Sequence, residues 1–233
     1  TPLAELPALR ELHVRGCAKT AGLAPIGRVT NLEELQIEVR PDLTPLTRLT
    51  RLRRLGLSGC EDLRDLSILG RLPWLEELDI LGSPAADWAP LARLRRLASL
   101  RLTYCDELND LAPLGELSAL TRLELVRCYK VAEIAPLARL TGLTDLRLDG
   151  CDWVADLAPI ARLSKLRALS LGGCLGGNAT IVGASSNVVM SGLSEKYGHK
   201  IGFGRFLKYG VPVVLLSLTV SSVYLYLRYF LGR

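Results

Sequence analysis

The chain has 233 residues, enough for one or two domains, and 49% of them are hydrophobic while only 6% are aromatic. Its net charge of +5 is carried by residues 176–233, where six Lys or Arg stand against one Glu, so residues 1–175 are neutral. A neutral segment has no electrostatic footprint for DNA or RNA, so we expect no nucleic acid as a partner. The basic residues instead flank an apolar stretch, which points to a membrane surface.

One frame, L-x-x-L-x-L-x-x-C, recurs along residues 1–174 and is clearest at Leu143–Cys151. Such a fixed period predicts a solenoid, in which each repeat buries its leucines against its neighbours. Because the L-x-L part alternates, we expect a short strand in each of about eight repeats, with the leucines pointing inward. The closing positions of the frame are residues 17, 40, 60, 83, 105, 128, 151 and 174.

The second half of each repeat reads approximately D-L-x-P-L-x-x-L-x-x-L. Its proline suits the first turn of a helix, and the three-residue steps that follow suit a 3₁₀ turn or a short helix on the convex side. Ile68 replaces the proline in one repeat, which we expect to be irregular. The prolines are Pro25, Pro45, Pro90, Pro113, Pro136 and Pro159. Three tryptophans in the variable turns are expected to pack, namely Trp74, Trp88 and Trp153.

All cysteines occupy the closing position of the frame. Their spacing is not a zinc-ligand spacing, and nothing else in the sequence predicts a metal site or a cofactor. A disulfide framework is the alternative, but one cysteine per repeat favours a column of buried, reduced thiols at the strand exits. Reduced thiols would indicate a reducing compartment. The cysteines are Cys17, Cys60, Cys105, Cys128, Cys151 and Cys174.

Residues that alternate with the inward leucines point to solvent on the concave face, the usual binding surface of a solenoid. Their mixed charges suit a protein partner; the alternative is a solvated face whose cross-strand ion pairs, such as Arg122 with Asp145, contribute little. Neither His13 nor His199 has an evident partner, and we find no nucleophile–base pair or phosphate loop, so we expect no enzyme. The candidate protein-binding residues are Arg54, Asp79, Arg101, Arg122, Glu124, Asp145, Arg147 and Asp149.

The repeats over residues 1–174 resemble the leucine-rich-repeat family, and the D-L-x-P-L half is similar to the internalin-type bacterial repeat, with Cys in place of its ladder Asn. The resemblance implies an α/β solenoid with a parallel sheet on the concave face and short 3₁₀ or α segments on the convex face. It implies a protein-interaction or sensor module. Similar Cys-bearing arrays occur as sensors of bacterial NTPase switches, and the chain starts in mid-repeat without Met, so the sensor of a larger switch protein is a further alternative.

After Cys174 the repeat stops, and residues 175–233 are predicted to be a second, helical domain. Residues 175–194 are an uncharged run that is rich in small side chains. Residues 209–227 carry no charge, and as a helix they measure about 28 Å, close to a bilayer core of about 30 Å. We therefore predict a transmembrane helix within about 206–230, because a helix that caps the solenoid would need a polar outer face.

Residues 168–230 resemble the last part of the arsenite/sodium–proton antiporter permeases, most specifically over Gly176–Val189. In that family the matching stretch is a broken helix near the bilayer midplane that helps to bind ion and substrate, so the resemblance implies a broken helix at about 178–194. A permease fragment is thus the second functional hypothesis, although small residues also pack helices without any ligand. With at most one span, a complete translocation path is absent. The candidate ion or substrate residues are Asn178, Thr180, Ser185 and Asn187.

The predicted span also indicates a location. Four Lys or Arg precede it and two follow it, which favours a cytoplasmic repeat domain attached to a membrane. If the tail is not native, the expected location is the cytoplasm. The stretch Ala168–Asn178 satisfies the repeat pattern and the permease pattern at once, so a crossover there would be nearly seamless.

Overall fold

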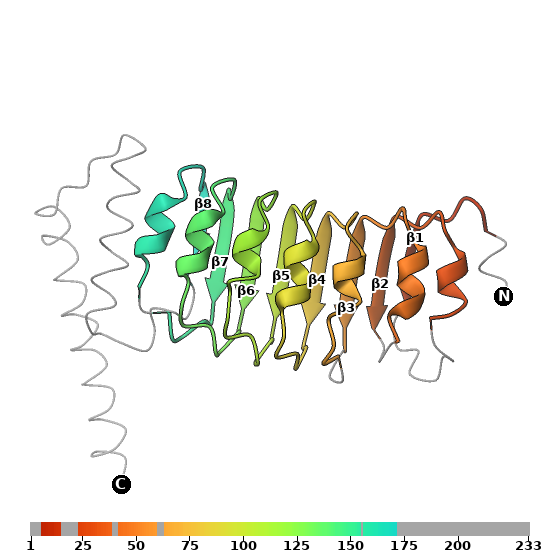
Figure 1. The fold of residues 1–233 in the computed structure, drawn as a ribbon, viewed down its shortest axis with the longest axis horizontal. Coiled ribbons are helices and arrows are strands. Elements are labelled where there is room, and N and C mark those ends of the chain that lie inside the picture. Colours follow the sequence, from red (N-terminus) through yellow and green to blue (C-terminus); the bar gives the residue numbers. More distant parts are fainter. Residues whose placement is uncertain (1–5, 15–22, 39–41, 60–62, 155, 172–233) are drawn as a thin grey trace, which may run out of the picture. The chain divides into compact units, whose positions relative to one another are not determined.

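The computed structural model describes residues 6–14, 23–38, 42–59, 63–154 and 156–171. Along this part of the chain, short strands alternate with 3₁₀ turns of three to five residues (Figure 1). The strands are β1 (Glu11–Val14), β2 (Glu34–Glu38), β3 (Arg54–Ser58), β4 (Glu77–Leu81), β5 (Ser99–Thr103), β6 (Arg122–Val126), β7 (Asp145–Asp149) and β8 (Ala168–Ser170). The 3₁₀ turns are η2 (Ile26–Arg28), η3 (Thr44–Arg48), η4 (Leu69–Arg71), η5 (Ala89–Arg93), η6 (Leu114–Glu116), η7 (Ala135–Arg139) and η8 (Ala158–Arg162).

The strands form one eight-stranded parallel sheet in the order β1 to β8. In every pair the register places an inward aliphatic residue beside the same repeat position of the next strand, so these side chains form two columns. The predicted stacking of repeats is therefore confirmed. One column is Leu12, Leu35, Leu55, Leu78, Leu100, Leu123, Leu146 and Leu169, and the other is Val14, Ile37, Leu57, Ile80, Leu102, Leu125 and Leu148.

The core lies between the sheet and the 3₁₀ turns. From β2 to β7, every member of the two columns is at most 2% exposed, whereas the residues that alternate with them along the strands are partly or fully exposed. On the convex side, Leu137, Leu140 and Leu143 are at most 1% exposed, so the three-residue spacing also points inward. The sequence expectation of inward leucines on both halves of the repeat is confirmed.

In six of the seven described convex turns, the repeated proline stands at or near the first residue. Pro25 has a φ of −66° at the start of η2, a value that the proline ring enforces. Ile68 takes the same place before η4 with a φ of −64°, and η4 has three residues like η2 and η6. The expectation of an irregular repeat at Ile68 is therefore wrong for this turn, because a β-branched residue can adopt the helical φ that proline fixes.

The aspartate of the D-L-x-P-L pattern forms a side-chain hydrogen bond at the start of these turns. In five repeats its Oδ1 accepts a hydrogen bond from the backbone N–H two residues later, at 2.8–2.9 Å. Such a turn satisfies an N–H that the 3₁₀ turn itself leaves without a partner. These aspartates are Asp42, Asp65, Asp87, Asp110 and Asp156.

The residue that follows each strand from β3 to β7 adopts a left-handed conformation. It is glycine in three repeats but Tyr104 and Arg127 in two others, both with a φ of 54°. This geometry lets the Tyr104 N–H donate to Val126 O at 2.9 Å and the Arg127 N–H donate to Asp149 O at 2.6 Å, which extends the ladder. The Arg127 guanidinium also lies 5.3 Å from the centre of the Tyr104 ring, a cation–π contact.

Three cysteines lie in the described part of the chain, and all three are fully buried thiols at the strand exits. The thiol of Cys128 donates to Leu102 O at 3.5 Å and that of Cys151 to Leu125 O at 3.6 Å, in the preceding repeat. The contact with the Cys128 thiol, together with burial, raises the pKa of Cys105. For these three positions the prediction of a buried thiol column is confirmed; Cys17, Cys60 and Cys174 lie outside the described residues.

The tryptophans differ from one another. Trp88 is 3% exposed and donates from Nε1 to Ala85 O at 2.9 Å, and so it packs as expected. Trp153 is 72% exposed, which contradicts the expectation that it packs. The turn after β7 leaves its ring outside the core, where Val154 occupies the inward position instead.

Among the described residues, no helix is both long and apolar enough to cross a bilayer. The predicted broken helix at 178–194 and the predicted transmembrane helix within 206–230 lie outside the described residues, as do Asn178, Thr180, Ser185 and Asn187. They stay predictions.

Candidate functional site

The outward side chains of the strands form three columns on the sheet, and the middle column passes through the centre of the concave face. The registers place Gln36, Gly56, Asp79, Arg101 and Glu124 beside one another in that order. Gly56 is the one glycine in this series, so the column lacks a side chain at β3. This gap follows from the sequence of β3, which reads R-L-G-L-S.

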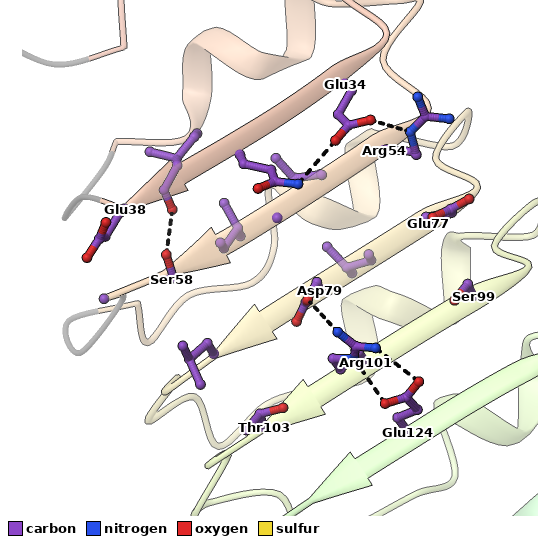
Figure 2. A pocket seen from close by; sticks show the side chains of 18 of the residues that line it. Glu34, Glu38, Arg54, Ser58, Glu77, Asp79, Ser99, Arg101, Thr103 and Glu124 are labelled. Carbon is purple, nitrogen blue, oxygen red and sulfur yellow. Dashed lines mark hydrogen bonds and ion pairs between the residues drawn. The ribbon is translucent and has the colours of Figure 1, made fainter. Parts of the chain in front are cut away.

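A hollow of about 710 Å³ covers the concave face from β2 to β6 (Figure 2). Its outer lining is polar and comes from five strands, while Leu55, Leu57 and Leu78 contribute to its floor. Because Gly56 has no side chain, backbone replaces a polar group at this point of the floor. Five of the eight predicted binding residues line the hollow: Arg54, Asp79, Arg101, Arg122 and Glu124.

One end of the hollow is held by a network around Glu34. Arg54 Nε donates to Glu34 Oε2 at 2.6 Å, Gln36 Nε2 donates to Oε1 at 3.1 Å, and His13 Nε2 lies 3.3 Å from Oε1. Partial burial raises the pKa of Glu34, but the hydrogen bonds from Arg54 and His13 lower it by more, so the net shift is downward. The hydrogen bond with Glu34 in turn raises the pKa of Arg54. His13 thus has a partner that the sequence did not reveal.

A second network crosses β4, β5 and β6. Arg101 donates from Nε and Nη2 to the two carboxylate oxygens of Glu124 at 3.0 and 3.1 Å, and its Nη1 lies 3.6 Å from Asp79 Oδ2. Burial raises the pKa of Asp79, Arg101 lowers it, and the negative charge of Glu124 raises it again, so the net shift is upward. Figure 2 shows Arg101 between the two carboxylates. Asp79 is therefore the less well neutralised of the two acids.

The remaining predicted residues lie on β7, beside the hollow and outside its lining. Arg122 and Asp145 are neighbours in the register, but they form no ion pair, and Thr144 Oγ1 donates to Asp145 instead at 2.6 Å. This example of a cross-strand ion pair does not form, whereas Arg54 with Glu34 and Arg101 with Glu124 do form such pairs. Arg147 bonds Asp149 on its own strand, and Asp149 also accepts a hydrogen bond from Ser170.

Comparison with solved structures places this geometry among known proteins. An internalin (InlF) of Listeria monocytogenes superposes with a TM-score of 0.65 and 32% identity, over 74% of this chain and 50% of that chain. The described repeats form a leucine-rich-repeat solenoid, and its fold is similar to that of this internalin. An internalin C2 of the same species superposes on this solenoid with a TM-score of 0.62 and 28% identity, over 75% of this chain and 79% of that chain.

A second likeness is short and of another kind. An uncharacterized transporter of Synechocystis sp. is 54% identical over 50 residues, which are 22% of this chain and 11% of the transporter. The chain therefore spans only a small part of the transporter that it matches. No family model matches the chain. The similarity to internalin structures and the short similarity to a transporter agree with the two resemblances found in the sequence.

The candidate residues lie on the outward face of the strands, but the sequence prediction missed two features of the hollow. Glu34 and Glu77 line it, although neither was a candidate. Gly56 leaves a gap in the lining of the hollow. The sequence could have indicated this gap, because β3 has a glycine where its neighbours in the middle column are mostly charged or amide residues. No group of three or more His, Cys, Asp or Glu side chains that could hold a metal ion occurs among the described residues.

We expect the Glu34 network to give a pH-dependent contribution to stability. Since the folded-state pKa of Glu34 lies below its ordinary value near 4.5, its contribution is present above that value and is lost as the pH falls through the folded-state pKa. Glu34→Gln should therefore cost about 0.5–1 kcal/mol at pH 7 and much less at pH 3, measured by urea unfolding. Glu133→Gln, which removes an exposed carboxylate that has no ion pair in the described structure, is the control. A loss that is the same at both pH values would contradict the assignment.

Proposed function

We propose that the solenoid is a non-catalytic protein-binding module whose partner lies on the concave face. The hollow that spans β2 to β6 supports this proposal most strongly, because five strands present polar and charged side chains to one ligand-sized space. Such a surface can complement a partner in charge and shape, and electrostatic complementarity of this kind gives specificity more than raw affinity. The likeness to internalins supports a role in interaction rather than in catalysis.

Site-specific photocrosslinking in cells that express the full chain tests this proposal. A benzoylphenylalanine at Ser99, inside the hollow, should give a discrete crosslinked protein, whereas the same group at exposed Ser164, after η8, should not. Crosslinked species should be absent when Arg101→Glu disrupts the pairing of Arg101 with Glu124. Equal crosslinking from both positions would mean that the concave face has no dedicated ligand.

A second proposal concerns the tail. We infer that residues 1–174 and 175–233 are separate domains and that the second attaches the repeats to a membrane. The uncharged run at 209–227 and the 50-residue likeness to a transporter support this inference. Transport itself is the less favoured alternative, because the chain matches only 11% of that transporter.

Fractionation of the full chain tests the membrane proposal. We expect it in the carbonate-resistant membrane pellet, and we expect Leu216→Arg combined with Val220→Arg to release it, since charged residues at the centre of a span oppose insertion. The matched variant Leu215→Ile with Val213→Ile should stay in the pellet. Recovery of the unchanged chain in the supernatant would end this proposal, and arsenite uptake by cells that express the chain would favour the permease alternative.

A further inference from the structure

The concave hollow is not evenly charged. Its β2–β4 part contains four carboxylates, from Glu34, Glu38, Glu77 and Asp79, but one guanidinium, that of Arg54. That guanidinium is already engaged, because it bonds Glu34 at 2.6 Å and lies 3.8 Å from Glu11. This part of the hollow therefore holds more negative charge than its own arginine neutralises.

Three of these carboxylates have no short ion pair. Within the part of the chain that the structure describes, Glu38 and Glu77 form no ion pair within 4 Å, although the charge of Glu77 acts on Arg54, its neighbour in the register. Asp79 has only the 3.6 Å contact with Arg101, whose two shorter bonds go to Glu124. The upward shift of the Asp79 pKa agrees with this, since burial and Glu124 outweigh what Arg101 provides.

Gly56 leaves an opening beside Asp79, with Glu38 and Glu77 toward its opposite ends. It is paired in register with Asp79, while Glu38 and Glu77 are diagonal to it on the flanking strands, roughly 7–8 Å away for such neighbours. A Cβ at this position would have Gln36 Cγ at 3.3 Å as its nearest neighbour. Glycine weakens the interior of a strand and marks places where another group approaches the backbone closely. Its φ here is not in the left-handed region, so the backbone of β3 does not require glycine.

We propose that the hollow receives a basic side chain, Lys or Arg, from a cationic segment of the partner protein, seated over Gly56 against Asp79, with Glu38 and Glu77 at opposite ends of the opening. This inference rests on the proposed protein-binding function and names the chemistry of the partner. A long basic side chain suits the site because its stem can lie on the exposed β3 backbone while its charged end reaches the carboxylates. Arginine can bind one carboxylate with two parallel hydrogen bonds.

Selection from a random 12-residue peptide library displayed on phage, with the full chain as bait, tests the inference. The selected peptides should share a Lys or Arg, and replacement of that residue by Ala should weaken binding about tenfold or more. Their affinity should also fall as salt rises from 50 to 500 mM, because partly exposed charges are screened. A library that gives no binders, or binders without a common basic residue, overturns the inference.

Two variants test whether the selected peptides bind at the opening over Gly56. Gly56→Thr fills the opening with a strand-forming residue, so it should leave the melting temperature unchanged or higher while weakening peptide binding at least tenfold. Glu77→Gln with Asp79→Asn should weaken binding similarly. The matched control is Glu133→Gln with Asp152→Asn, two exposed acids outside the hollow, which should bind as the unchanged chain does. Equal binding by Gly56→Thr overturns the inference.

The outcome is distinguishable from that of the proposed function. If photocrosslinks form at Ser99 but the selected peptides lack a basic residue, the concave face binds protein and only the partner chemistry is wrong. If Ser99 gives no crosslinks, the protein-binding function itself fails. A charge swap completes the test, because Asp79→Lys should bind peptides whose basic residue is replaced by Glu.

Discussion

Leu146→Ala is expected to destabilise the solenoid by about 2–5 kcal/mol, the range for a leucine truncated inside a packed core. Leu146 lies in the inward column on β7, is 2% exposed, and is flanked in the register by Leu123 and Leu169. The cavity would lie inside the column, where the parallel sheet keeps the flanking strands at a fixed spacing and limits collapse. Urea or thermal unfolding of the full chain measures the loss.

The control is the same substitution on the opposite face of the sheet. Leu81 ends β4 and is 40% exposed, so Leu81→Ala removes the same atoms but leaves little cavity. Its expected cost is about 0.5 kcal/mol or less. If the two variants lose similar stability, or Leu146→Ala loses well under 1 kcal/mol, the inward assignment of the leucine columns is wrong.

The inward columns could be predicted from sequence because the same leucine positions recur in each repeat. A single leucine says little, but leucines such as Leu102, Leu125 and Leu148 recur at 23-residue steps, and only stacking buries all of them together. The convex turns were predictable for a similar reason, since proline fixes φ. Ile68 shows the limit of that argument, because it keeps the turn without the ring.

The pairing on the concave face could not be read in the same way. Register tells which residues are neighbours, but the choice of partner depends on side-chain reach and on competing groups. Arg122 faces Asp145 in register, yet Asp145 accepts the nearby Thr144 hydroxyl, while Arg101 turns to Glu124 rather than equally to Asp79. Glu34 gathers three donors, from His13 on β1, Arg54 on β3 and Gln36 on its own strand.

A second expected result concerns the convex side, where Gly115→Ala should destabilise the solenoid by about 1–3 kcal/mol, as overpacking does. Gly115 lies in η6, and a Cβ there would meet the carbonyl oxygen of Pro136, in the next repeat, at 2.7 Å. Backbone cannot move aside as a flexible side chain can, so the neighbouring turns would have to separate. The same contact occurs between Gly70 and Pro90 O at 2.8 Å, which makes Gly70→Ala an independent copy of the test.

Ordinary helix propensity predicts the opposite sign, because alanine is favoured over glycine by about 1 kcal/mol in a helical turn. The contact with Pro136 O should outweigh that gain. Gly142→Ala is the matched control, since a Cβ there has its nearest neighbour, Leu120 O, at an ordinary 3.5 Å and its φ is not left-handed. It should be neutral or should stabilise by about 0.4–1 kcal/mol, through a less flexible unfolded chain. Chemical unfolding of the three variants decides the matter: if Gly115→Ala and Gly70→Ala stabilise as Gly142→Ala does, the convex turns are not in backbone contact, and the close stacking of repeats on that side is wrong.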